Sequence, residues 1–297
     1  MYFPVAGIDL NPLIPPITAF VISFFTSMAG VSGAFLLLPI QVSLLGFTTP
    51  AVSATNHLFN ITAIPSGIYR FIREDRMIWP LTWLVITGTL PGVIAGAIIR
   101  IKLLPDPQSF KIFAGLVLLY IGVKLTRDLL GKNPKQSPAT ATKPNTPFPT
   151  VSQIKLTRKN ISYRFNDQQY QASTPGIFCL SLIVGLVGGV YGIGGGAIIA
   201  PFFVTIYRLP IHTVAGATLM GTFTTSAAGV LLFQILDTYF DVGSVAPDYL
   251  LGFLFGVGGA AGIYCGARMQ RYFPARLIKT ILTVCILFTA TSYLVFR

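Results

Sequence analysis

Two clusters of glycines inside apolar segments are the residues of this sequence best suited to bind a ligand. The second cluster is Gly192-Ile-Gly-Gly-Gly196, and the first is Gly30-Val-Ser-Gly33. Glycine lets an oxyanion approach the backbone closely, and the free N–H groups of a helix that starts near Ala34 or Ala197 attract negative charge. Such a helix break can bind an anion without Lys or Arg. A kink or tight helix packing is the alternative explanation of the glycines.

Neutral polar side chains follow each glycine cluster. The first set is Ser53, Thr55, Asn56, His57, Asn60, Thr62 and Ser66, and the second is Thr218, Thr222, Thr224, Thr225, Ser226 and Gln234. Their hydroxyls and amides can donate hydrogen bonds to an oxyanion, or they can bond to the preceding turn and to neighbouring helices. The candidate substrate-binding residues are Gly30, Ser32, Gly33, Ala34, Asn56, His57, Asn60, Gly192, Gly194, Gly195, Gly196, Thr218 and Thr222.

His57 is the only titratable side chain well inside an apolar span. Because a histidine changes charge near pH 6–7, one interpretation is a proton carrier or a substrate contact. The other is a neutral imidazole that is hydrogen-bonded to a neighbouring carbonyl. The sequence leaves both open.

Chemistry that needs a charge or a nucleophile has little support. The spans at 50–69, 77–99, 213–236 and 249–267 contain no Asp, Glu, Lys or Arg, so carboxylate proton relays and cation pores lack their usual residues. The three cysteines have no metal-ligand spacing, and no nucleophile–base pair is recognisable. We expect no enzyme, no metal site and no cofactor.

The composition indicates the class of protein in which these candidate binding residues lie. The chain has 297 residues, of which 53% are apolar and 10% are charged, whereas a soluble domain carries about 25% charge. This excludes a soluble enzyme and predicts an all-α polytopic membrane protein. Eight apolar stretches lie near 13–46, 50–69, 77–99, 107–130, 175–207, 211–236, 246–267 and 275–296.

The two halves of the chain repeat each other. The ten residues from Gly30 to Pro39 align without a gap on those from Gly192 to Pro201, at an offset of 162. Two stripes of small residues also correspond, and they consist of Gly88, Gly92 and Gly96 and of Gly258, Gly262 and Gly266. Glycines at every fourth position let another helix approach closely, so we expect these stripes to serve packing.

The first segment of each half has an unusual length. Residues 17–46 and 177–207 are each about 30 residues long, against the roughly 20 that cross a bilayer. If these segments cross once, the basic residues divide 13 to 8 between the two sides, whereas a fold back divides them 17 to 4. The positive-inside rule favours the second arrangement. It predicts two inverted repeats, each a glycine-broken re-entrant helix pair plus three transmembrane helices, with both termini outside.

A basic linker separates the halves. The expected units are a first membrane repeat at 13–130, the linker at 131–173 and a second membrane repeat at 174–297. The linker carries +6 of the net charge of +12, which indicates a cytoplasmic location rather than a nucleic-acid partner. Its proline-rich first part is not expected to form a packed element, while alternation around Asn166-Asp167 predicts a small β-hairpin.

The motif Gly-x-Gly-Gly-Gly-x-x-x-x-Pro at 192–201, echoed at 30–39 and followed each time by a polar helix, resembles the TauE/SafE family. This family comprises sulfite, sulfoacetate and sulfonate transporters and is also called the 4-toluene sulfonate uptake permeases. The first half departs from the motif, since Ser32, Ala34 and Phe35 replace the smaller residues Gly194, Gly196 and Ala197 of the second half. The resemblance implies transport of a small sulfur-containing or organic anion.

The expected function is secondary transport of a small anion across a bacterial inner membrane by alternating access. The partners that we expect are the anion, the lipid bilayer and a coupling proton or ion. A passive anion channel is the alternative. A receptor or scaffold is less favoured, because a linker of 43 residues supplies no large soluble domain.

Overall fold

Helices dominate the computed structural model, which describes residues 1–28, 31–104, 106–130, 151–166, 168–238, 245–269, 272–273 and 275–295. Within these ranges, five helices are long and apolar enough to cross a membrane. Shorter apolar helices accompany them, and the polytopic helical fold predicted from composition is confirmed. Gly30, Asp167 and the proline-rich part of the linker lie outside the described residues.

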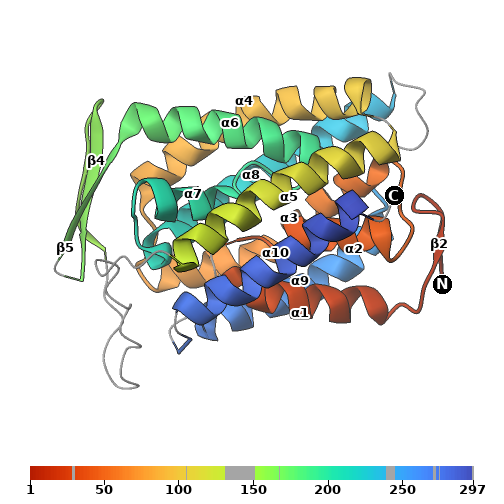
Figure 1. Ribbon diagram of the computed structural model, residues 1–297, viewed down its shortest axis with the longest axis horizontal. Coiled ribbons are helices and arrows are strands. Elements are labelled where there is room, and N and C mark those ends of the chain that lie inside the picture. The colour runs from red at the N-terminus through yellow and green to blue at the C-terminus, as the bar shows by residue number, and fades with distance from the viewer. Residues whose placement is uncertain are drawn as a thin grey trace.

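The helices follow the same order in each half (Figure 1). The first half contains α1 (Ile14–Met28), α2 (Ala34–Ser43), α3 (Ala51–Arg73), α4 (Trp79–Leu103) and α5 (Pro107–Leu130). The second contains α6 (Thr174–Tyr191), α7 (Ile199–Ile206), α8 (Ile211–Asp237), α9 (Tyr249–Met269) and α10 (Ala275–Val295). Each half therefore starts with two helices that are joined by a break, as the glycines predict, but α6 with 18 residues is long enough to count among the five candidate spans.

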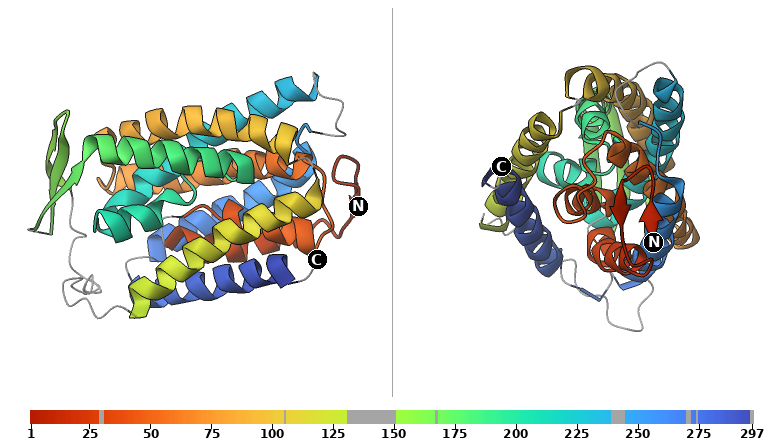
Figure 2. Two further views of the ribbon diagram at one scale, coloured as in Figure 1. Left: turned by 45° about the horizontal axis from the view of Figure 1, so that its top comes forward. Right: turned by 90° about the vertical axis from the view of Figure 1, so that its right-hand side faces the viewer.

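The two broken pairs enter the helix bundle from opposite ends. α6 starts at the end that carries the sheet, and α7 lies back toward that end (Figures 1 and 2). α1 starts at the other end, beside the N-terminal strands, and α2 lies toward that end. Both chain termini lie at the end opposite the sheet. The inverted relation of the complete halves stays a prediction, as does their orientation in a membrane.

The helices of one half interlock with those of the other. α4 packs along α6, and α9 packs in the corresponding way along α1. α3 contacts α8 and α9, while α8 contacts α3 and α4. α5 pairs with α10 at one side of the bundle. Exchanging each helix for its counterpart in the other half leaves this set of contacts unchanged.

The glycine stripes make the closest of these contacts possible. A Cβ atom on Gly92 of α4 would lie 2.6 Å from the backbone nitrogen of Leu186 in α6. A Cβ atom on Gly262 of α9 would overlap the carbonyl oxygen of Phe20 in α1. No real side chain fits at such distances, so the packing role predicted for the stripes is confirmed.

A three-stranded antiparallel sheet precedes α6, with the order β3 (Ser152–Leu156), β4 (Asn160–Phe165) and β5 (Gln168–Ser173). β4 and β5 form the hairpin over the stretch where alternation predicts one, and β3 was not predicted. The Tyr163 and Thr213 hydroxyls are 2.8 Å apart and tie the sheet to the start of α8. A second, short hairpin at the N-terminus joins β1 (Tyr2–Phe3) to β2 (Ile8–Asp9).

Candidate anion-binding site

Asn56 of α3 lies between the two helix breaks and is hydrogen-bonded to both. Its Nδ2 donates to the carbonyl oxygen of Ala34 at 3.0 Å and to that of Gly192 at 3.1 Å. Gln41 Nε2, from α2, donates to Asn56 Oδ1 at 3.3 Å. One fully buried amide therefore connects the broken pair of the first half to that of the second.

Asn60 repeats this arrangement one turn further along α3, on the same helix face. Its Nδ2 donates to the carbonyl oxygen of Ile193 and to Ser226 Oγ, each at 3.0 Å. The hydroxyl of Ser32, at the first break, donates to Asn60 Oδ1. Ser32 Oγ also accepts from the N–H of Ala34, the first residue of α2, at 3.1 Å.

The second break is shaped by glycines in the left-handed region. Gly192 has a φ of 79° and ends α6, and Gly194 has a φ of 83°. The N–H of Gly195 donates to Thr225 Oγ1 of α8 at 3.0 Å. Within the described chain, the N–H groups of Gly194 and Gly196 donate to no acceptor. These two groups lie just before α7 and are available to an anion, as is the N–H of Ile198, which donates to no described acceptor either.

At each of these glycines, atoms of neighbouring helices already occupy the space that a side chain would fill. A Cβ atom on Gly195 would lie 2.5 Å from Thr89 Cβ of α4, and one on Gly194 would lie 2.8 Å from Ser226 Oγ of α8. At the first break, a Cβ atom on Gly33 would lie 2.6 Å from Ser23 Oγ. The glycines thus let neighbouring helices close around the breaks, and a ligand can approach only from the N–H side.

His57 is fully buried and faces the second half. Its Nδ1 lies 3.2 Å from Ser226 Oγ, and its Nε2 has no hydrogen-bond partner in the described structure. The ring packs 5.9 Å from that of Phe233. The partner is a hydroxyl of α8 rather than the carbonyl that one interpretation of the sequence requires. Ser226 therefore connects His57 to Asn60.

The predicted threonines lie beside the second break, but their protons are engaged in α8. Thr218 Oγ1 donates to the Ala215 carbonyl at 3.0 Å, and Thr222 Oγ1 donates to that of Thr218 at 2.8 Å. Thr222 contacts the glycines closely, since its backbone nitrogen would lie 2.6 Å from a Cβ atom on Gly196. These two side chains fit a packing role in this conformation.

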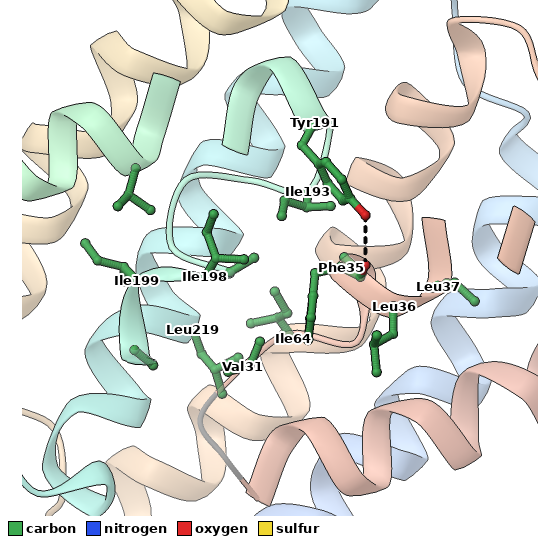
Figure 3. Close-up of a cluster of buried hydrophobic side chains, with 14 of the residues drawn as sticks. Val31, Phe35, Leu36, Leu37, Ile64, Tyr191, Ile193, Ile198, Ile199 and Leu219 are labelled. Atoms are coloured by element: carbon green, nitrogen blue, oxygen red, sulfur yellow. Dashed lines mark hydrogen bonds between the residues drawn. The ribbon is translucent and has the colours of Figure 1, made fainter. Parts of the chain in front are cut away.

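Apolar side chains from both halves form a buried cluster at the breaks (Figure 3). Val31 and Phe35 come from the first broken pair, while Ile193 and Ile198 come from the second break. Tyr191 Oη reaches across and donates to the carbonyl oxygen of Phe35 at 3.3 Å (Figure 3). This packing excludes water, so hydrogen bonds at the breaks are stronger than on a surface.

The structure brings most of the predicted residues together at this place. They are Ser32, Gly33, Ala34, Asn56, His57, Asn60, Gly192, Gly194, Gly195, Gly196, Thr218 and Thr222. Gln41, Thr225 and Ser226 were not selected, although the last two stood in the polar set that follows the second glycine cluster. A polar residue within the apolar stretch at 13–46 was the signal for Gln41.

Comparison with known proteins places the chain in a family. The family model described as sulfite exporter TauE/SafE matches residues 16–293. The chain is 24% identical over 272 residues to the probable membrane transporter protein YunE of Bacillus subtilis, covering 86% of this chain and 89% of YunE. It is 26% identical over 121 residues to the probable membrane transporter protein YdhB of the same organism, covering 41% of this chain and 46% of YdhB.

A probable membrane transporter protein of Haemophilus influenzae is 26% identical over 100 residues, which cover 33% of this chain and 35% of that protein. The chain thus matches less than half of YdhB and of the Haemophilus protein, but most of YunE. No solved structure matches. Since the family model covers nearly the whole chain and five helices can span a membrane, the protein belongs to the TauE/SafE sulfite exporter family and is a multi-pass membrane transporter.

Proposed function

We propose that this transporter carries a small sulfur-containing oxyanion, such as sulfite, thiosulfate, sulfoacetate or another sulfonate, by alternating access. The anion would be held by backbone N–H groups at the helix breaks. The family description supports the sulfur chemistry, and the geometry of the breaks supports the anion. Neither argument depends on the other.

The observation that carries the proposal is the position of Asn56 between the two breaks. Its amide bonds to a carbonyl of each broken pair, so movement of α1–α2 against α6–α7 changes the groups around it. The symmetric set of helix contacts is what a two-fold relation between the halves produces. Transporters of that design bind substrate where the broken helices meet.

Neutral donors suit a substrate that must be released as well as bound. The N–H groups of Gly194 and Gly196 and the positive end of α7 can attract an oxyanion without a permanent ion pair. The amides of Asn56 and Asn60 can exchange their present carbonyl partners for substrate oxygens. Binding of moderate strength follows from such contacts.

A membrane potential that is negative inside favours outward movement of an anion by about 2.3 kcal/mol per charge at 100 mV. The breaks lack carboxylates that could couple several protons to uptake, so we propose export. The unpartnered Nε2 of His57 makes this side chain the candidate for sensing or carrying a coupling proton.

Flux measurements in proteoliposomes test the carrier. With radiolabelled sulfite inside, we expect saturable efflux that is accelerated by unlabelled sulfite outside and by an outside-positive potential. A flux that does not saturate and does not exchange would instead support the passive channel. A flux that is indifferent to the sign of the potential would contradict electrogenic export.

Labelling tests the orientation. Single cysteines at Gln169 in β5 and at Asn11 near the N-terminus, both exposed, would be introduced after the native Cys179, Cys265 and Cys285 are replaced. In intact cells, an impermeant thiol reagent should label only the cysteine at position 11. Labelling of both positions, or of position 169 alone, would contradict the proposed topology.

A further inference from the structure

Arg100, in the last turn of α4, is a charged side chain that the site described above does not use. Its side chain is completely buried, and none of its three guanidinium nitrogens has a hydrogen-bond partner. The guanidinium lies over the ring of Phe110, at 4.0 Å from the ring centroid. From the sequence, Arg100 was one of four basic residues counted on the outer side.

A buried guanidinium without a counter-charge is unfavourable for the protein by itself. Removing a full charge from water has a large free-energy cost unless an opposite charge or several hydrogen bonds replace the water. A cation–π contact offsets only a small part of that cost. In this conformation the guanidinium of Arg100 therefore lacks a counter-charge, which a bound anion would supply.

Asp106 is the one carboxylate in the described part of the chain that acts electrostatically on Arg100, and it does so from outside ion-pair distance. The carboxylate of Asp106 is exposed and accepts the N–H of Ser109 at 2.8 Å, and it forms no ion pair with Arg100. The arginines at the sheet end of α3 differ in this respect. Arg70 and Arg76 lie 2.5 Å and 2.9 Å from the carboxylate oxygens of Glu74.

Arg100 lies close to the second helix break. Gly96, one turn earlier on the same face of α4, packs against the end of α6, where its Cβ atom would lie 2.7 Å from the nitrogen of Val190. The Phe110 ring beneath Arg100 is 6.0 Å from the ring of Tyr191, the last residue of α6. Tyr191 in turn donates to the carbonyl of Phe35 in α2 (Figure 3). An aromatic pair thus connects the guanidinium to both broken pairs.

We propose that Arg100 is a binding residue for the transported oxyanion, placed between the helix breaks and the end of the bundle where the termini lie. This inference rests on the proposed function, since it takes anion transport as given. A guanidinium forms two parallel hydrogen bonds with an anion that presents two oxygens, so Arg100 selects sulfite, sulfonates or carboxylates over halides. Because the side chain is buried here, the anion reaches it only after the neighbouring ends of α4 and α5 separate.

The test is a thermal-shift titration of the purified full-length protein with sodium sulfite, with sodium chloride added to equal ionic strength in every sample. The variants are Arg100→Gln, Arg100→Lys and Arg100→Met. Lys111→Gln is the matched control. It also removes one positive charge next to Phe110, but Lys111 is not buried. Asn56→Asp reports separately on the helix breaks.

We expect the sulfite concentration for half-maximal stabilisation to rise about tenfold or more in Arg100→Gln and by less in Arg100→Lys. It should not change in Lys111→Gln. Chloride should not substitute for sulfite in the wild-type protein. Without any anion, Arg100→Met should melt at a higher temperature than the wild type, because an unpaired buried charge has been removed.

Two results would overturn the inference. One is an Arg100→Gln protein that responds to sulfite at wild-type concentrations, and the other is an anion-free Arg100→Met protein that melts below the wild type. If Arg100→Gln behaves as the wild type while Asn56→Asp loses its response, the proposed function stands and only this inference fails. If Arg100→Gln and Asn56→Asp both respond to sulfite as the wild type does, the proposed function and this inference both fail.

Discussion

The two helix breaks have the same position in their halves but are stabilised in different ways. At the first break a side chain satisfies the backbone, since Ser32 accepts the N–H of Ala34 and donates to Asn60. The second break runs from Gly192 to Ile198 and is shaped by two glycines with positive φ, with Thr225 as its one partner from α8. At the first break a side chain therefore bonds to the backbone, whereas the second is shaped by glycines, and both breaks leave N–H groups without a described acceptor.

This difference assigns different roles to the two breaks. The Ser32 side chain occupies one N–H group of the first break and bonds to Asn60, whereas glycine lets an oxyanion approach the backbone of the second break closely. We therefore expect the second break to contact the anion more extensively, and the first to hold Asn60 in position. The substitutions below test this assignment, beginning with the one that affects both breaks.

Asn56→Asp should have the largest effect. It places a carboxylate where an amide now donates to carbonyls of both breaks, so it repels the carbonyl oxygens and any anion. Transport of sulfite in proteoliposomes should fall about 100-fold or more. Thr62→Val is the control on the same helix, because the Thr62 hydroxyl only donates to Leu58 in its own helix. Normal transport by Asn56→Asp would remove Asn56 from the site.

Gly195→Ala tests the packing of the second break. The added methyl group overlaps Thr89, so unfolding should become easier by roughly 1–3 kcal/mol. Thr89→Gly removes the overlapping Cβ, and the double variant should recover part of the loss, as measured by melting temperature in detergent. Additive effects of the two substitutions would show that these residues do not contact each other.

Ser32→Ala and Thr225→Val compare the capping of the two breaks. The first leaves two buried groups without a partner, the Ala34 N–H and Asn60 Oδ1, and the second leaves only the Gly195 N–H. Each group costs about 1–3 kcal/mol, so Ser32→Ala should lower the melting temperature more. Equal effects would remove this distinction between the two breaks.

His57→Gln should have the smallest effect on stability and a specific effect on pH dependence. Glutamine keeps a hydrogen-bonding group near Ser226 but cannot change charge, so the pH dependence of transport should flatten while transport persists. His212→Gln, near the start of α8, is the control and should keep the wild-type profile. Complete loss of proton-driven uptake in His57→Gln would instead make His57 the coupling residue.

Much of the helical framework could be predicted from the sequence, because the relevant signals are local. Apolar length and glycine position locate both breaks, and four-residue spacing identifies the packing stripes. The unequal lengths of α6 and α7, and the strand β3, depend on tertiary contacts that no local pattern records.

The residues of the site could be predicted from the sequence, but the hydrogen bonds between them could not. Polar composition identified Asn56 and Asn60, whereas their bonds to carbonyls of the other half require the fold. The burial of Arg100 was missed because it follows an apolar stretch that ends at residue 99, and a terminal arginine normally reaches water. In the structure α4 continues to Leu103, and Phe110 of α5 packs against the guanidinium.

The pairing of α1 with α9 has a consequence for how the chain assembles during synthesis. α1 is among the first segments made, yet the glycine surface on which it packs belongs to Tyr249–Met269, one of the last. α1 is therefore in the bilayer without its packing partner until synthesis of the chain is nearly complete. The N-terminal half, expressed alone, should remain open to proteolysis, and co-expression of the C-terminal half should protect it.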